Sequence, residues 1–189
     1  IRDYETAEMA VRASLTGHLV FSTLHTNDAA GSVTRLTDMG VEPFLISSTL
    51  IAALAQRLVR MNCPDCVEVY EPSDEEFEEL GVSRDDPLAQ GAVFKRGTGC
   101  DECRNTGYRG RLAITEILPF TPPIKELTVQ RATSTVIKAR GCELGMRTLR
   151  ESGWERVCEG MTTFEEIMRV TVESDHIEAV ETADAAVSI

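Results

Sequence analysis

The sequence predicts an α/β layer fold that carries a separate cysteine-containing segment and ends in helices. Residues 1–60 show apolar patterns in the order helix, strand, helix, helix, which suggests part of an α/β layer fold. Residues 61–110 contain four of the six cysteines and have 12 acidic against 5 basic residues, a net charge of −7. Beyond residue 119 the apolar spacing is almost entirely helical.

Composition limits the classes of function. The 189 residues include 31 acidic and 19 basic side chains, a net charge of −12, and 42% are hydrophobic, which is enough for one or two small domains. No run approaches the roughly 18 apolar residues of a membrane span, and the N-terminus lacks a signal-peptide layout, so we expect a soluble, cytosolic chain. The net negative charge of the chain disfavours binding to nucleic acid and to anionic lipid. A protein or small-ligand partner is expected instead.

The first 60 residues predict a helix, a buried strand and two further helices. Apolar spacing indicates a helix over Thr6–Leu15, and the short apolar run Leu19–Leu24 is typical of a buried strand. The side chains of Thr26-Asn27-Asp28 are suited to cap a helix that ends near Met39. Pro43–Arg60, apolar nearly all round and opened by proline, predicts another helix.

Beyond the cysteine segment, one strand and several helices are expected. Leu112–Leu118 predicts a strand, and Thr163 with Glu166 three residues later predicts a capping box at the start of the last helix. The other predicted helices are Ile124–Leu127, Thr135–Arg140 and Met146–Cys158. The segment 173–189, rich in Ala, Glu, Asp and Ser, predicts a disordered tail.

Two CxxC pairs are the strongest chemical signal. Cys63 and Cys66 form the first, and Cys100 and Cys103 follow after 33 intervening residues. Such pairs can present four thiolates to tetrahedral Zn²⁺, and an all-cysteine set predicts a structural ion because no position is left for water. Two disulfides would be unusual in a cytosolic chain, and a redox-active CxxC would need a different context.

A second candidate site is the run from Thr16 to Asn27, a predicted strand with a histidine at each end. His18 and His25 are seven positions apart, so on a straight strand they face opposite sides, roughly 23 Å apart at about 3.3 Å per residue. His25 stands at the carboxyl end of the strand, before Thr26 and a helix N-terminus, where ligands bind in open α/β sheets. The alternative is that His25 makes only a capping or structural hydrogen bond.

The opening residues are Ile1-Arg2-Asp3 rather than Met, and they run directly into a helical pattern. We therefore expect the chain to be a fragment of a longer protein. On chemistry alone, the charged group Arg2-Asp3-Tyr4-Glu5 indicates an ordinary solvated helix start, with acidic residues favoured by the helix dipole.

Taken in order, these pieces resemble one family, the ATPases of type II secretion and type IV pilus assembly of the GspE/PilB kind. The two cysteine pairs contribute to the resemblance. The other matching segments are IRDYETAEMAVRASLTGHLVFSTLHTNDA at 1–29, the stretch from 35 to 60 that ends in LAQRLVR, GYRGRLAITEIL at 107–118 and EGMTTFEEIMRVT at 159–171.

The resemblance implies the C-terminal part of a RecA-like P-loop ATPase domain with an inserted tetracysteine zinc subdomain and a helical C-terminal region. On this basis residues 1–60 belong to the ATPase core, 61–110 to the zinc subdomain and 111–172 to a return strand and helices. It also implies ATP and Mg²⁺ as cofactors and a homo-hexamer at the cytoplasmic face of the inner membrane. There the hexamer would work with a platform protein and other assembly components, without nucleic acid.

The resemblance also assigns roles to single residues. His25 corresponds to a phosphate-sensing histidine and His18 to the second histidine of the same motif, which the strand geometry places too far away to act on the same γ-phosphate. Arg2, Asp3 and Thr26 are expected beside the nucleotide. The Walker A motif GxxxxGKS/T is absent from the sequence, and the catalytic Glu would precede Ile1, so this chain alone is expected to be inactive.

Two other functions remain open on the sequence. One is a non-catalytic zinc-bearing adaptor that contacts partner proteins through the acidic segment 74–86. The other is a redox protein that uses a CxxC pair, for which thiols with unusually low pKa values are expected.

Overall fold

The computed structural model describes residues 1–171 and divides the chain into two compact units. Unit 1 comprises residues 1–55 and 116–147, and unit 2 comprises residues 56–115 together with the described residues 148–171. The segment 61–110 therefore lies wholly in unit 2, while the tail expected at 173–189 lies outside the described residues. No helix among the described residues is long and apolar enough to cross a membrane.

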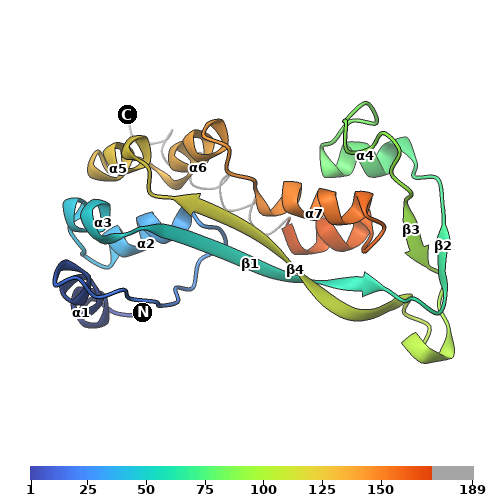
Figure 1. Ribbon diagram of the computed structural model, residues 1–189, viewed down its shortest axis with the longest axis horizontal. Helices are drawn as coiled ribbons and strands as arrows, with labels where there is room; N and C mark the ends of the chain where they lie inside the picture. Colours follow the sequence, from blue (N-terminus) through green and yellow to red (C-terminus); the bar gives the residue numbers. More distant parts are fainter. Residues whose placement is uncertain (172–189) are drawn as a thin grey trace, which may run out of the picture. The chain divides into compact units, whose positions relative to one another are not determined.

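Unit 1 consists of five helices and part of a two-stranded sheet. The sheet pairs β1 (Ala52–Asn62) with β4 (Tyr108–Pro119), and each unit contains part of both strands. The helices are α1 (Tyr4–Leu15), α2 (Gly31–Asp38), α3 (Pro43–Thr49), α5 (Pro122–Val129) and α6 (Ser134–Glu143). Helix α5 packs against both α3 and α6 (Figure 1). Buried apolar side chains from these elements, including Val33, Ile46 and Ile137, form the core of the unit.

Helix α1 confirms the first predicted helix and begins two residues earlier. Asp3 is its N-cap, because the Asp3 Oδ1 accepts the backbone N–H of Thr6 at 2.9 Å. These hydrogen bonds from Thr6 lower the pKa of the Asp3 carboxyl, since they favour its charged form. Gly17, with φ 91°, follows the helix in the left-handed region that ends it.

The buried strand predicted at Leu19–Leu24 is wrong for the described structure. This segment lies in no strand or helix. Leu19 is 68% and Phe21 89% exposed, and only Leu24 at its end packs against the core. A strand requires the backbone of a neighbouring strand to satisfy its N–H and C=O groups, and no strand within residues 1–171 pairs with this one. The apolar run has the composition of a strand, but composition does not identify a second strand to pair with it.

The helix predicted over Pro43–Arg60 is also wrong in its second half. The helix ends at Thr49, Leu50 is extended at φ −75° and ψ 128°, and the following residues form β1. A continuous apolar run fits a buried helix or a strand equally well. Here pairing with β4 decides the outcome, because backbone pairing and side-chain packing override intrinsic helix propensity.

The N-terminus of α2 differs from the prediction in its details. The helix begins at Gly31, and its N-cap residue is Ala30, which makes no side-chain capping hydrogen bond. Asp28 contributes instead, because its Oδ1 accepts the backbone N–H of Gly31 at 2.7 Å. The predicted helices after residue 119 are present, most of them slightly longer than expected, and the strand predicted at 112–118 lies within β4.

Unit 2 contains the cysteines, the acidic segment and the last helices. Its elements besides the sheet are β2 (Val67–Val69), α4 (Asp74–Leu80), β3 (Lys95–Gly97), the 3₁₀ turn Asp101–Cys103, α7 (Leu149–Cys158) and a helix over 164–171. Strands β2 and β3 pair antiparallel, with Val67 opposite Gly97. Figure 1 shows α4 joined to this pair by loops.

An aromatic cluster anchors the acidic segment to the unit 2 core. The Phe77 ring of α4 lies 5.8 Å from Phe94, 5.9 Å from Trp154 and 5.2 Å from Phe164, all in edge-on contacts. Pairs in this geometry stabilise beyond the apolar area that they bury. The segment between the two cysteine pairs is therefore folded, with its acidic side chains on the outer face of α4.

A buried carboxylate ties the last helix to β1. Glu166 is fully buried, and it accepts the backbone N–H of Arg60 at 2.8 Å and hydrogen bonds from the Arg60 and Arg169 guanidiniums. The predicted capping box is half correct: Thr163 caps the Glu166 N–H at 3.3 Å, but the Glu166 carboxylate turns to the arginines. The Arg60 guanidinium also lies 4.1 Å from the centre of the Tyr108 ring.

Replacement of Glu166 is expected to make the free energy of unfolding less dependent on pH. Burial alone would raise its pKa, but the hydrogen bonds from Arg169 and Arg60 outweigh burial and lower the pKa from 4.5 to about 2. The charged form therefore stabilises the fold above about pH 4.5, and this contribution is lost as the pH falls towards 2. Glu166→Gln should lower the free energy of unfolding at pH 7 by about 1–3 kcal/mol.

Thermal unfolding of both chains between pH 7 and pH 2 measures this effect. The gap between wild type and Glu166→Gln should narrow as the pH falls. Glu165→Gln is the matched control, because Glu165 is exposed on the same helix. A gap that stays constant with pH would show that the Glu166 charge does not stabilise the fold.

Candidate metal centre and histidine segment

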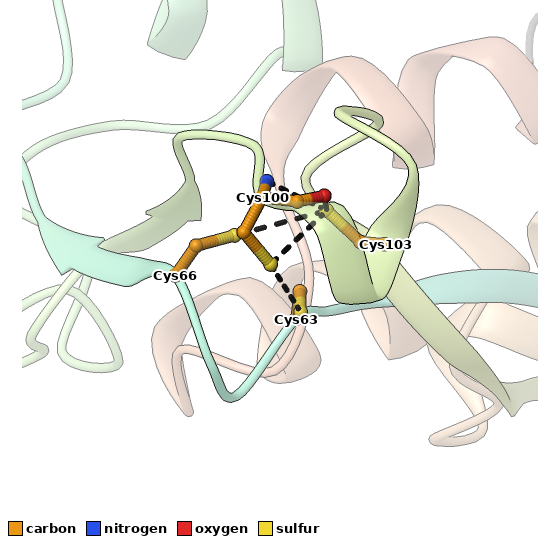
Figure 2. Close-up of side chains that lie close together, drawn as sticks. All are labelled: Cys63, Cys66, Cys100 and Cys103. Carbon is orange, nitrogen blue, oxygen red and sulfur yellow. Dashed lines mark hydrogen bonds between the residues drawn. The ribbon is translucent and has the colours of Figure 1, made fainter.

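The four cysteines converge on one point, as Figure 2 shows. Their sulfur atoms all lie within 4.8 Å of one another, and none of the cysteines forms a disulfide. The Sγ atoms of Cys63 and Cys100 are 3.9 Å apart, as are those of Cys66 and Cys103. Tetrahedral coordination at a Zn–S distance of about 2.3 Å places the sulfurs roughly 3.8 Å apart. The arrangement therefore fits a four-coordinate metal ion.

Backbone contacts bring the two cysteine pairs together. Cys63 directly follows β1, and its N–H donates to the Gly107 carbonyl at 2.9 Å. The Asn62 side-chain amide donates to the carbonyls of Lys95 at 2.8 Å and Gly160 at 3.0 Å, which fixes the end of β1. Pairing of β2 with β3 then carries the chain back towards the second pair of cysteines.

Close backbone approach at two glycines is part of this construction. A Cβ atom placed on Gly97 would lie 2.0 Å from the Gly107 carbonyl oxygen, and Gly107 itself has φ 76°. Only glycine allows this approach without displacement of the backbone. The glycine-rich pieces beside the second cysteine pair are therefore required by the geometry of the cluster.

Backbone N–H groups point at the sulfurs, as they do around metal-bound thiolates. The N–H of Cys100 and that of Gly107 each donate to the Cys103 Sγ at 3.2 Å. Burial opposes ionisation of Cys103, but these two donors outweigh it and lower the pKa of the thiol to about 6. Burial raises the pKa of Cys66 to about 12. Four thiolates at this spacing repel one another, so a cation is needed for all four to ionise.

An ion pair beside the cluster was not found by sequence reasoning. Arg109 Nη1 lies 2.7 Å from the Asp65 carboxylate and 3.7 Å from that of Glu102, which lie between the cysteines of the two pairs. The guanidinium therefore links the turn of one pair to that of the other. The sequence shows Arg109 among several basic residues near the cysteine pairs, suited to offset thiolate charge, but it does not identify Asp65 and Glu102 as partners.

The two candidate histidines are both exposed. His18 directly follows the turn after α1, and its Nδ1 lies 3.1 Å from the Thr16 hydroxyl. His25 precedes the turn that leads into α2, where the Thr26 hydroxyl donates to the Asp28 carbonyl at 3.1 Å. The separation of the histidines was estimated for a straight strand, and this estimate does not apply because residues 19–24 form no strand.

The charged residues at the chain start have separate surroundings. Arg2 is exposed, and Asp3 is bound to Thr6 as the cap of α1. This capping agrees with the structural interpretation of the Arg2-Asp3 pair. A role beside a nucleotide stays a prediction for both residues.

The buried Glu116 and the half-buried Lys138, neither singled out in the sequence, contact the segment that follows His25. The Glu116 carboxylate of β4 accepts the backbone N–H of Ala29 at 2.9 Å. Lys138 of α6 lies 3.5 Å from the Asp28 carboxylate. The available signal for Glu116 was one acidic residue within an otherwise apolar strand pattern.

Comparison with known proteins assigns the family. A family model described as Type II/IV secretion system protein matches residues 1–169. The chain belongs to this family. Within it, the chain is 49% identical over 174 residues to the type II secretion system ATPase E of Vibrio cholerae serotype O1, covering 92% of this chain and 34% of the relative. It is 48% identical over 173 residues to the type IV pilus assembly ATPase PilB of Thermus thermophilus, covering 92% of this chain and 19% of the relative.

The solved structures confirm the fold class. The crystal structure of the pilus retraction motor PilT with bound ADP matches with a TM-score of 0.57 at 22% identity, covering 90% of this chain and 37% of that chain. The secretion-family chain thus has the fold expected for the C-terminal part of a RecA-like ATPase domain, here with clustered cysteines. It spans about a third of the length of the type II secretion relatives.

Introduction of a side chain at Gly97 should open the cysteine cluster. In Gly97→Ala the new methyl group would collide with the Gly107 backbone, so β3 must shift. We expect a loss of about 1–3 kcal/mol in the free energy of unfolding and faster protease cleavage within residues 61–110. Glu68→Ala is a matched control, because Glu68 lies on the paired strand β2 and is exposed. Equal cleavage of the two variants would contradict the close-approach argument.

Proposed function

We propose that this secretion-family chain is part of an ATP-hydrolysing motor of type II secretion or type IV pilus assembly. The observation that carries the proposal is the match over residues 1–169, together with near 50% identity to ATPases of both machines. Because this chain spans about a third of the type II secretion relatives, the activity is proposed for the whole protein. Such motors convert ATP hydrolysis into movement of subunits, and the chain would form one side of the nucleotide site.

In this proposal the segment that leads from His25 into α2 faces the nucleotide. The exposed His25 imidazole would donate a hydrogen bond to the γ-phosphate, where negative charge is redistributed during phosphoryl transfer. Thr26 would approach the phosphates from the same segment, and Arg2 and Asp3 would balance charge beside the site. His18 would support the fold or a subunit contact. ATP would supply the phosphoryl group, and Mg²⁺ would neutralise its charge.

The exposed apolar run before His25 supports this proposal. Phe21 is 89% exposed and Leu19 68% exposed, in a segment whose composition favours a strand. Large apolar side chains adjacent in sequence and fully open to water usually mark a surface that is covered in the working protein. We infer that a neighbouring strand of the ATPase core covers this segment in the whole motor.

We further propose that the four cysteines hold a structural Zn²⁺. The sulfur spacing, the all-cysteine ligand set and the N–H donors to sulfur support this assignment. Zinc would supply the charge that allows four thiolates to coexist. Its function is to close the 33-residue excursion between the pairs, so that α4 can pack on the aromatic cluster.

The assembly and location of the motor are also proposals. The family resemblance supports a homo-hexamer at the cytoplasmic face of the inner membrane, in contact with a platform protein and other assembly components. The acidic charge of −12 supports protein partners rather than nucleic acid. Either machine is compatible with the relatives, since both classes are about equally similar.

The adaptor and redox alternatives are less well supported. An adaptor would leave the family match over 1–169 unexplained, although the acidic face of α4 is exposed. A lowered pKa at Cys103 is found in redox thiols and in metal ligands alike. The convergence of two separate CxxC pairs favours a metal, because a redox centre needs only one pair.

Loss of one sulfur ligand is expected to release the metal. Cys103→Ser removes the ligand that accepts two N–H bonds, and since site formation and folding are coupled, residues 61–110 should loosen. Zinc per chain, measured by elemental mass spectrometry, should fall close to zero, with faster proteolysis of this segment. Cys142→Ser, at an exposed cysteine, is the matched control and should keep its zinc. Full zinc content in Cys103→Ser would overturn the assignment.

Replacement of His25 tests the motor proposal. In the whole protein, His25→Ala should lower kcat for ATP hydrolysis roughly a hundredfold, because a donor to the transferred phosphate is lost. The melting temperature should change little, since His25 is exposed. The assay measures phosphate release and binding of an ATP analogue. Absence of nucleotide binding in the unmodified whole protein would reject the motor and favour the adaptor.

A further inference from the structure

Two carboxylates buried in unit 1 form hydrogen bonds to the backbone of the turn that follows His25. Glu116 of β4 is 1% exposed, and its Oε1 accepts the Ala29 N–H at 2.9 Å. Asp28 is 7% exposed; its Oδ1 accepts the Gly31 N–H at 2.7 Å, and its Oδ2 lies 3.5 Å from Lys138 Nζ. Strand β4 and helix α6 thus both fix the start of α2.

Glu116 occupies a position where packing alone would favour an apolar side chain. The inward positions on either side of it along β4 are Ile114 and Leu118, both fully buried. A carboxylate in this row gives up its hydration, a loss that only hydrogen bonds offset. A leucine would pack without that loss. The hydrogen bond from the Ala29 N–H is therefore a contact that an apolar residue could not replace.

The path of the turn depends on such side-chain bonds. Residues 18–30 lie in neither helix nor strand, so no regular ladder of backbone hydrogen bonds defines their course. Ala29 is buried at 2% exposure and is bound to Glu116. The preceding carbonyl, that of Asp28, accepts the Thr26 hydroxyl at 3.1 Å, which links the held residues to the neighbour of His25.

We propose that Glu116 is a positioning residue for His25: through Ala29, Asp28 and Thr26 it fixes where the imidazole meets the phosphate. This inference rests on the proposed function of His25. It assigns to a buried β4 carboxylate a role in the reaction without contact with the nucleotide. A shift of about 1 Å in a reacting group can lower a rate up to a hundredfold, so even a small relaxation of the turn would be measurable.

Two substitutions of similar size separate positioning from packing. Glu116→Gln keeps an oxygen that can accept the Ala29 N–H, whereas Glu116→Met keeps the length and removes the acceptor. In the 189-residue chain, NMR should show the Ala29 amide proton and the His25 ring signals displaced in Glu116→Met and near their original positions in Glu116→Gln. Leu118→Ala, a core change on the same strand, controls for general loosening.

Kinetics of the whole protein complete the test. Glu116→Met should lower kcat for ATP hydrolysis about tenfold or more with KM for ATP nearly unchanged, and Glu116→Gln should restore most of kcat. Equal losses in both variants that follow melting temperature, as in Leu118→Ala, would overturn the positioning role. If His25→Ala loses turnover while Glu116→Met keeps it, positioning fails and the proposed function stands. If His25→Ala keeps full turnover, the role of His25 itself fails, and the inference fails with it.

Discussion

In each unit, a buried carboxylate that accepts a backbone N–H joins segments far apart in sequence. Glu116 holds Ala29 in unit 1, and Glu166 holds Arg60 in unit 2, across 87 and 106 residues. Desolvation of a carboxylate costs several kcal/mol, which is recovered only if the oxygens are fully bonded. These two bonds are consequently specific: they form only in one register of the segments, whereas apolar contacts tolerate sliding.

The same principle explains which features the sequence could reveal. The cysteine pairs, the strand within β4 and the helix α1 are local patterns, and they were predicted at or near their true positions. The helix over Pro43–Arg60 failed at Leu50 because the choice between helix and strand depends on a pairing partner more than 45 residues away. The sequence did not predict that Glu116 and Glu166 accept distant backbone N–H groups, for the same reason. An acidic residue in an apolar pattern indicates that the carboxylate is buried, but it does not identify the distant N–H group that bonds to it.

The predicted strand at Leu19–Leu24 failed in a different and more informative way. Its composition is that of a strand, yet the described structure leaves Phe21 89% exposed and offers no strand to pair with it. Local propensity can be satisfied only when a neighbour supplies the second half of the hydrogen-bond ladder. The prediction failed because no strand within residues 1–171 supplies this ladder, and composition alone does not reveal whether such a partner is present.

Together these contacts distinguish residues that hold the backbone in place from the exposed residues proposed to bind the nucleotide. In unit 2, sulfur, aromatic and arginine contacts all lock backbone segments to one another, and the proposed zinc ion would complete that network. In unit 1, the exposed His25 lies immediately before residues that Glu116 and Lys138 hold from below. In the proposed motor, the His25 imidazole would need both access to the nucleotide and a backbone that is held in one position. The Glu116 and Lys138 contacts hold the backbone after His25 from the interior and leave the imidazole exposed, although burial of the Glu116 charge costs stability.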